Sequence, residues 1–284
     1  MTHQSKNAAT EATSSEQQER KAFIDLFNTI ARHRHRYEVF KDFVTVAAIA
    51  IHNAARKDET LEAEYMDIVG RYTKEEAISL SHLLAMLVNM LEPTPRDVLG
   101  TLFMDLNLGS SHTGQFFTPH HISELMALIG YGEQLENLDV PFVTLSEPAC
   151  GAGGMVLAFV KVMIGKGHNP AKRLWAQCQD IDRTAALMCY LQLALWHVPA
   201  AVIVGNTLAN EQREVFYTPA HYLHGWRYKL EGRWKRKAEA DFAQEEGADG
   251  VPVALPVSQS TESAALPAMP MDVPKMTMQV DFGF

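Results

Sequence analysis

The sequence predicts an α/β fold, with a doubly wound parallel sheet beside an N-terminal lobe of helices. The first observation is an apolar run at 142–145, followed by a glycine-rich turn and a helix-like run at 155–164. The second is that two more apolar runs, 174–179 and 201–204, also end in polar residues. Strands that alternate with helices are typical of a parallel sheet. The third is a helical spacing of apolar residues through the first 110 positions.

The N-terminal part predicts a disordered start and then a helical lobe. Residues 1–20 are polar and rich in Ser and Gln, and the lobe spans 21–112. Its apolar positions recur every three or four residues: Phe23, Leu26, Phe27, Ile30; Phe40, Phe43, Val44, Ala47, Ile51; Leu80, Leu83, Leu84, Leu87. Pro93 and Pro95 break this pattern, which restarts at Asp97.

A proline-containing segment, GQFFTP at 114–119, precedes the first strand. Thr118 and Pro119 predict a helix start, with a hydroxyl cap and then proline at the first helical position. The helix that follows carries four apolar residues on one face: Ile122, Leu125, Met126 and Ile129.

The segment EPACGAGG at 147–154 is the most informative turn. Its glycines leave the backbone open to a ligand, and the N–H groups at the helix start favour a polar group. Glu147 ends the strand, and its carboxylate would repel a pyrophosphate but attract a sulfonium or ammonium charge. The turn therefore predicts S-adenosylmethionine rather than a dinucleotide. A tight structural connection is the alternative that a single glycine-rich turn leaves open.

Polar residues also end the next two strands. The run 174–179 leads into Asp180-Ile181-Asp182 and then a helical run at 185–196, and 201–204 leads into GNTL at 205–208. An acidic residue at the end of the second strand is where a doubly wound fold binds a ribose. We expect all three polar strand ends at the same edge of one sheet.

The ordered set GQFFTP, EPACGAGG, QDID and GNTL resembles the N-6 adenine DNA methyltransferases, especially the modification subunits of type I restriction systems. The resemblance covers about residues 70–208. It implies a shortened Rossmann-like S-adenosylmethionine-dependent methyltransferase sheet at 113–238, which methylates the exocyclic amine of adenine in DNA. It also implies a set of cofactor-binding residues: Phe117, Thr118 and Pro119 at the methionine; Glu147, Ala149, Gly151 and Gly153 as the floor; Asp180 at the ribose; Asn206 at the adenine ring.

The chain departs from this family at the catalytic motif. The family carries Asn-Pro-Pro-aromatic after the fourth strand, and this sequence has no such tetrapeptide. Tyr217 or Tyr222 would then stack the base and His221 would accept a proton, although an aromatic-rich loop packed on the sheet is the plainer interpretation. The rival function is a catalytically inactive cofactor-binding or regulatory subunit that pairs with another methyltransferase or restriction subunit. A small-molecule or protein methyltransferase is more distant.

The segment after the third strand limits the size of the sheet. Residues 206–238 suffice for about one or two more strands. The sheet is therefore shortened, or completed by another chain. Residues 239–284 contain five prolines and no sustained period, and predict a disordered acidic tail. Its end, 279–284, loosely resembles a peptide that docks on the sliding clamp; folding back onto the domain is the alternative.

The charge distribution leaves room for a DNA partner. Eight acidic residues and one lysine lie from position 239 onward, so the preceding 238 residues carry −2 of the net charge of −9. Two basic clusters lie in that body, 32–36 and 227–237. Aromatic residues interleave the second, which supplies the DNA-binding candidates Arg227, Lys229, Arg233 and Lys235. A solvated helix face and a charged domain boundary are the alternatives.

Composition points to a cytoplasmic location. The sequence contains no apolar run of membrane-spanning length and opens with no signal peptide. Three cysteines without CxxC spacing exclude a recognisable zinc site and suit a reducing compartment. Cys150, inside the glycine turn, is interpreted as a small filler beside the cofactor rather than a nucleophile.

Overall fold

The computed structural model describes residues 3–108, 117–233, 235–236 and 279–281. The chain divides into two compact units. The first comprises residues 1–224 and 274–284, and the second comprises residues 225–273. None of the described helices is both long and apolar enough to cross a membrane.

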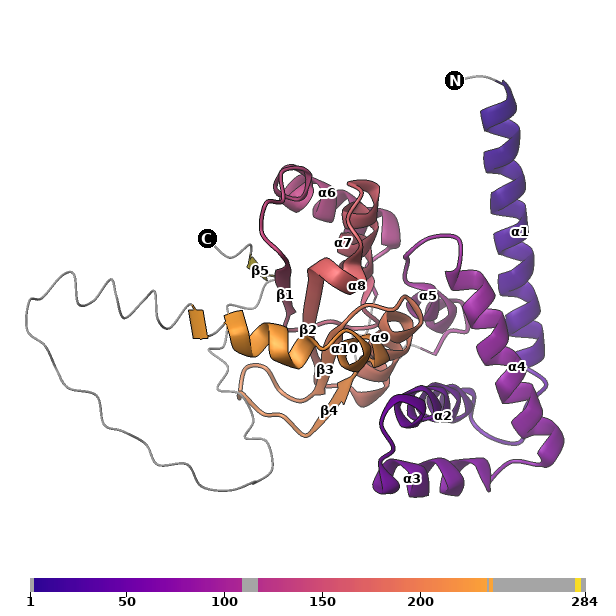
Figure 1. Ribbon diagram of the computed structural model, residues 1–284. Coiled ribbons are helices and arrows are strands. Elements are labelled where there is room, and N and C mark those ends of the chain that lie inside the picture. Colours follow the sequence, from indigo (N-terminus) through magenta and orange to yellow (C-terminus); the bar gives the residue numbers. More distant parts are fainter. Residues whose placement is uncertain (1–2, 109–116, 234, 237–278, 282–284) are drawn as a thin grey trace, which may run out of the picture. The chain divides into compact units, whose positions relative to one another are not determined.

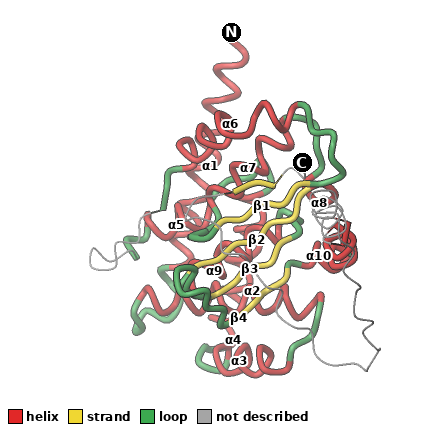
Figure 2. The backbone as a smooth tube through the Cα atoms, turned by 90° about the vertical axis from the view of Figure 1, so that its left-hand side faces the viewer, coloured by secondary structure: helices red, strands yellow, loops and turns green. Residues whose placement is uncertain are grey.

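The first unit holds a five-stranded sheet (Figures 1 and 2). Its strands lie in the order β4-β3-β2-β1-β5. Their bounds are β1 (Val143–Glu147), β2 (Leu174–Asp180), β3 (Ala200–Val204), β4 (Glu214–Tyr217) and β5 (Gln279–Asp281). The three central strands are parallel, whereas β4 and β5 run antiparallel at the two edges. The predicted parallel α/β sheet is confirmed, in shortened form.

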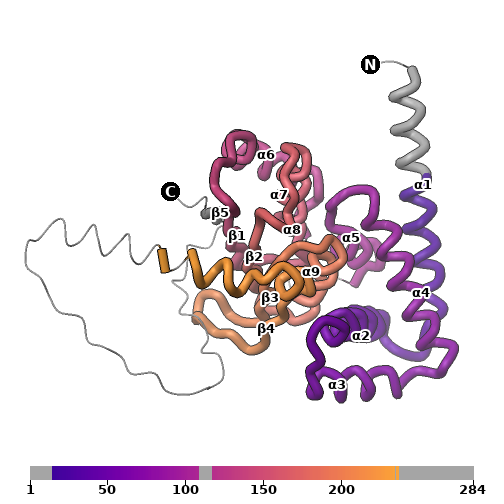
Figure 3. Tube along the Cα trace, in the orientation of Figure 1, coloured from indigo at the N-terminus to yellow at the C-terminus, as the bar shows by residue number. Residues whose placement is uncertain are grey.

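Helices precede the sheet and connect its parallel strands (Figure 3). The N-terminal lobe contains α1 (His3–Phe27), α2 (Arg36–Ala55), α3 (Glu59–Val69), α4 (Lys74–Leu91) and α5 (Val98–Asp105). The sheet region contains α6 (His120–Glu136), α7 (Gly154–Gly165), α8 (Pro170–Arg173), α9 (Arg183–Leu195) and α10 (Pro219–Leu223). Short polar side chains begin several of them; Thr73 and Glu76, for example, form a capping box at α4.

The lobe and the sheet share one hydrophobic core. Aromatic rings of the lobe pack edge to face, and the same cluster of buried residues continues into the sheet and α7. An ion-pair network also joins the two: Arg183 on α9 donates to Glu64 on α3 and to Glu214 on β4. The lobe is therefore part of the same folded unit as the sheet.

Both ends of the chain are more regular than the sequence predicted. A disordered start was expected up to residue 20, whereas α1 begins at His3. Residues 3–20 are rich in good helix formers, and Glu16 and Arg20 form ion pairs with Arg96 and Asp105. At the other end, 279–281 form β5 on the free edge of β1. This part of the expected tail folds back, whereas 237–278 and 282–284 lie outside the described residues.

Helix α6 differs from the prediction in its start and its packing. Pro119 is the N-cap, no side chain caps the helix, and Thr118 is not its cap. The face with Ile122, Leu125, Met126 and Ile129 is exposed; Ile129 has 77% of its surface accessible. Helix α6 packs on α7, and its buried positions are the mostly small residues Ser123, Ala127, Gly132 and Leu135. Small side chains allow close approach of two helices, and the larger apolar residues of α6 remain exposed.

Candidate functional site

The glycine turn lies between β1 and α7 and has a backbone that requires glycine. Gly151 and Gly153 have φ angles of 53° and 92°, and Gly153 is the N-cap of α7. A Cβ on Gly153 would lie 2.9 Å from the Sγ of Cys189 on α9. The turn is therefore wedged against α9, and the first N–H groups of α7 remain available to a ligand.

The polar strand ends meet at this turn, as the sequence predicted. Because β1, β2 and β3 are parallel and in register, Glu147, Asp180 and the residues after Val204 share the carboxyl edge of the sheet. Asp180 accepts hydrogen bonds from the backbone N–H groups of Gly151 at 2.8 Å and Asp182 at 2.9 Å. The second strand end thus holds the turn of the first.

Two carboxyl groups, one buried and one partly buried, give this edge its electrostatic character. Burial raises the pKa of Glu147 against the hydrogen bond from Ala149, and the Asp180 charge raises it further. Burial likewise raises the pKa of Asp180, where hydrogen bonds from Asp182 and Gly151 oppose it. Two negative charges held close together in a poorly hydrated place favour a bound cation.

The segment before α6 borders the same turn. The ring of Phe117 lies so close to Gly151 that a Cβ there would be 3.3 Å from two of its atoms. Phe103 on α5 packs edge to face with this ring, at 5.5 Å between centroids. Phe117 is thus beside the turn, as the resemblance implied, and Gly114 to Phe116 lie outside the described residues.

The side chain of Asn206 binds the backbone of the residues that follow it. Its side-chain oxygen accepts hydrogen bonds from the N–H groups of Leu208 at 3.0 Å and Ala209 at 3.3 Å. Thr207 donates to the carbonyl oxygen of Pro148, which ties this loop to the glycine turn. An acceptor role of Asn206 toward an adenine amine stays a prediction and requires the remaining lone-pair capacity of that oxygen.

A buried polar clamp behind the turn was not predicted. Gln192 on α9 has no exposed surface; its amide donates to Ala152 O in the turn and to Asp97 Oδ1. Its oxygen accepts from the N–H groups of Val98 and Leu99 at the start of α5. All four hydrogen-bonding positions of the amide are therefore used. The signal in the sequence is a single glutamine within the apolar run 185–196.

The three cysteines lie close to this turn and are buried. The hydrogen bond with Cys189 acts to lower the pKa of Cys150, but burial and the nearby charged groups outweigh it and raise the pKa to about 12. A thiol with so high a pKa stays protonated and is a poor nucleophile. This agrees with the interpretation of Cys150 as a filler.

The candidate catalytic residues lie at the opposite end of the parallel strands, the amino edge of the sheet. Strand β4 is antiparallel to β3, so Tyr217 pairs with Ala201 near the amino end of β3. His221 on α10 accepts a hydrogen bond at Nδ1 from Trp175 Nε1, near the start of β2. Tyr217 and Tyr222 pack against the His221 ring. The structure brings these three residues together but does not bring them to the glycine turn.

His221 is also a weak base in this environment. Burial lowers its pKa from 6.5 to about 4. The imidazole is therefore neutral near pH 7, and its Nδ1 lone pair is occupied by Trp175. The arrangement matches an aromatic-rich segment packed on the sheet, the alternative that the sequence left open.

The basic candidates lie in the second unit. Residues 226–233 are helical. Arg227 forms an ion pair with Glu231 at 2.9 Å, and Lys229 lies over the Trp226 ring at 4.3 Å. Both cations thus have partners within their own helix, and a DNA-binding role for them, Arg233 and Lys235 stays a prediction.

Comparison with known proteins identifies the family. The model of the N-6 DNA methylase family matches residues 101–244, half of the chain. The chain is also similar to the type I restriction enzyme MpnII methylase subunit of Mycoplasma pneumoniae, with 31% identity over 123 residues. That alignment covers 42% of this chain and 21% of the relative, so the chain spans only about a fifth of the relative's length. The matched region includes the glycine turn, the acidic strand ends and the segment with Phe117, and the chain belongs to the N-6 DNA methylase family.

Proposed function

We propose that the chain binds S-adenosylmethionine at the glycine turn and transfers its methyl group to the exocyclic amine of adenine in DNA. One observation carries the proposal: two carboxyl groups, the buried Glu147 and the partly buried Asp180, flank a left-handed glycine turn at the carboxyl edge of a parallel sheet. This combination suits a sulfonium compound that also carries a ribose.

Each residue has a role that its position supports. Glu147 supplies negative charge near the cationic part of the cofactor, and Gly151 and Gly153 allow its close approach. The Asp180 carboxylate already accepts from two backbone N–H groups, and its remaining lone pairs accept from the ribose hydroxyls. Phe117 closes one side of the site.

S-adenosylmethionine supplies, when bound, an electrophilic methyl group on a positively charged sulfur. Transfer forms a nitrogen–carbon bond at adenine, leaves the electron pair of the broken bond on sulfur and releases one proton from the amine. Groups that grip the base at the carboxyl edge are needed for this step. Tyr217, His221 and Tyr222 lie at the other edge and are not assigned to it.

That separation favours a second candidate function. A chain with a cofactor site but no Asn-Pro-Pro-aromatic motif is suited to act as a cofactor-binding or regulatory subunit. A second methyltransferase subunit would then supply the base-binding groups, or a specificity subunit would supply the DNA contacts. Sliding-clamp docking through 279–284 is less favoured, because 279–281 pair with β1.

Incubation of the purified full chain with radiolabelled S-adenosylmethionine and adenine-containing duplex DNA tests both candidates. We expect cofactor binding by calorimetry and N6-methyladenine in the digested DNA. Binding without transfer to any DNA would favour the regulatory subunit. Absence of binding in a folded protein would contradict both candidates.

Glu147→Gln is the matched variant for this experiment. It keeps the shape of the side chain and removes its charge, so it should weaken binding and reduce transfer at subsaturating cofactor. Equal activity of the variant and the wild type would move the site away from this turn.

A further inference from the structure

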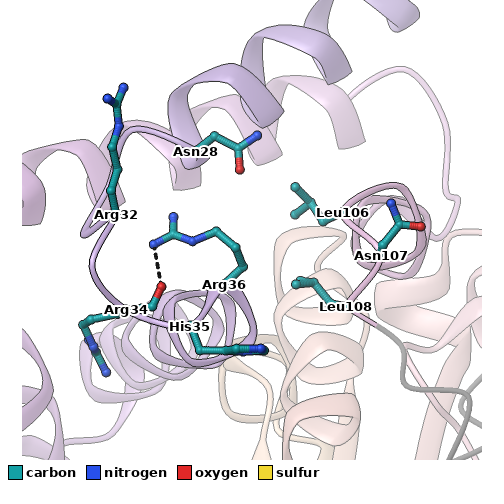
Figure 4. A pocket seen from close by; sticks show the side chains of 8 residues that line it. All are labelled: Asn28, Arg32, Arg34, His35, Arg36, Leu106, Asn107 and Leu108. Carbon is teal, nitrogen blue, oxygen red and sulfur yellow. Dashed lines mark hydrogen bonds between the residues drawn. The ribbon is translucent and has the colours of Figure 1, made fainter.

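A cavity of about 580 Å³ lies between the turn that joins α1 to α2 and the end of α5 (Figure 4). The first basic cluster of the sequence, 32–36, forms one wall of this cavity. Its lining residues are Asn28, Arg32, Arg34, His35, Arg36, Leu106, Asn107 and Leu108. Three arginines and a histidine line the cavity, and none of the described residues that line it is acidic.

Two of the three arginines hold the turn itself. Arg36 donates to the carbonyl oxygens of Phe27, Ile30 and Ala31, at and beyond the end of α1. It also donates to the carbonyl oxygen of Arg34 (Figure 4). Arg34 forms an ion pair with the buried Asp42 at 2.8 Å. These contacts fix the turn and neutralise the carbonyl groups that would otherwise repel an anion.

The third arginine and the histidine remain available. Arg32 is exposed and forms no hydrogen bond or ion pair with another described residue. The Nδ1 atom of His35 accepts from the N–H of Tyr37, so its proton is on Nε2, which is a donor in either charge state. The amides of Asn28 and Asn107 add donors from the two walls. The positive end of the α2 helix lies at the same place, since His35 is its N-cap.

The cavity is connected to the glycine turn by three aromatic rings that pack edge to face. Tyr37, next to His35, packs on Phe103 at 6.3 Å, and Phe103 packs on Phe117 at 5.5 Å. Phe117 in turn covers Gly151. The basic cavity and the cofactor turn thus belong to one continuous packed region of the first unit.

We infer that this cavity binds the phosphate backbone of DNA, with Arg32 and the Nε2–H of His35 as its principal donors to separate phosphate groups (Figure 4). Arginine and imidazole donors around an acid-free hollow match a phosphodiester. The choice of DNA as the source of the phosphate rests on the proposed function.

Fluorescence anisotropy with a labelled duplex tests the inference on the full chain. Arg32→Gln should weaken DNA binding about five- to tenfold at low salt and reduce the slope of log affinity against log salt by about one. His35→Asn keeps a side chain able to cap α2 and should also weaken binding. Lys172→Gln is the matched control: it removes one exposed positive charge on α8, before β2, and should change affinity less than twofold.

Inorganic phosphate separates the two sources of the anion. Weak competition by millimolar phosphate, together with the loss in Arg32→Gln, supports a DNA contact. Wild-type DNA affinity in both Arg32→Gln and His35→Asn overturns the inference. So does tight binding of free phosphate that these variants lose without a change in DNA affinity.

Cofactor calorimetry on the same variants distinguishes this failure from failure of the proposed function. If Arg32→Gln binds the cofactor and its DNA affinity is unchanged, the inference about the cavity is wrong and the proposed function stands. If DNA binding depends on Arg32 but the protein does not bind the cofactor, the proposed function is wrong and the DNA contact at the cavity stands.

Discussion

The carboxyl and amino edges of the sheet, where the parallel strands end and begin, both hold buried polar side chains, but these side chains have different surroundings. At the carboxyl edge, the buried Glu147 and the partly buried Asp180 lie beside the glycine turn, and their negative charges repel each other. At the amino edge, His221 is buried among aromatic rings and satisfied by Trp175. The carboxyl edge therefore holds negative charge that a bound cation can neutralise. The amino edge holds a neutral imidazole that already has a hydrogen-bond partner. Strand direction thus decides which polar side chains reach the glycine turn.

The largest expected effect concerns the clamp behind the carboxyl edge. Gln192→Leu would remove a buried partner from the Asp97 carboxyl, from two N–H groups and from the Ala152 carbonyl, although Asp97 and the Val98 N–H each keep a second partner. We expect a loss of about 3 to 4 kcal/mol in the free energy of unfolding, measured by chemical denaturation. Gln179→Leu, which removes one such bond to Glu211 O, should cost about 1 kcal/mol. Equal losses would show that the clamp is not a unit.

The glycine turn should show the next effect. Gly153→Ala requires a left-handed alanine and places its Cβ against Cys189, so we expect a loss of about 2 to 3 kcal/mol. Cys189→Ala in the same chain should recover part of it, because the contacting sulfur is gone. Gly165→Ala at the end of α7, where a Cβ meets nothing within 4 Å, should be close to neutral. Additive effects of the two substitutions would argue against the contact.

The dependence of stability on pH should have opposite signs at the two edges. Because His221 has its pKa lowered from 6.5 to about 4, its contribution is complete above pH 6.5 and is lost as the pH falls toward 4. His221→Asn should remove roughly 1 to 3 kcal/mol of that dependence. Glu147 and Asp180 have raised pKa values, so their ionisation makes the cofactor-free protein less stable as the pH rises above their ordinary range.

Denaturation curves of wild type and variants across pH 4 to 7 measure both signs. Glu147→Gln should reduce the loss in the free energy of unfolding as the pH is raised. His221→Asn should reduce the loss in the free energy of unfolding as the pH is lowered. A wild-type profile in His221→Asn would mean that this imidazole is not desolvated in the folded protein.

The smallest effect sharpens the comparison at the level of the cofactor. Glu147→Gln should raise the Kd for S-adenosylmethionine about tenfold, or about 1.4 kcal/mol, because a charge pair is lost. Tyr217→Ala and His221→Ala should change it less than twofold in calorimetry of the folded variants. A comparable loss in all three proteins would place the amino edge at the site.

Sequence patterns located the carboxyl edge because its signals are local. A glycine with φ of 92° must be glycine, and a polar residue at the end of a buried strand has a position fixed by that strand. The same patterns placed residues 217–222 near the cofactor turn, whereas they lie at the amino edge. The local sequence of β4 does not show that this strand runs antiparallel to β3. They also missed Gln192, whose four partners come from two segments distant in the chain.

The sequence alone determined the parallel strands, the glycine turn, the acidic strand ends and the family, since each depends on short-range geometry or on an ordered set of motifs. Only the tertiary structure decided which cations are free and which strand edges are covered. Arg36 and Arg32 are alike in the sequence, yet one is bound by four carbonyl oxygens and the other is exposed. β5 covers β1 from more than 130 residues away. Such pairings join groups that are distant in the sequence and meet only after folding, so local sequence patterns do not predict them.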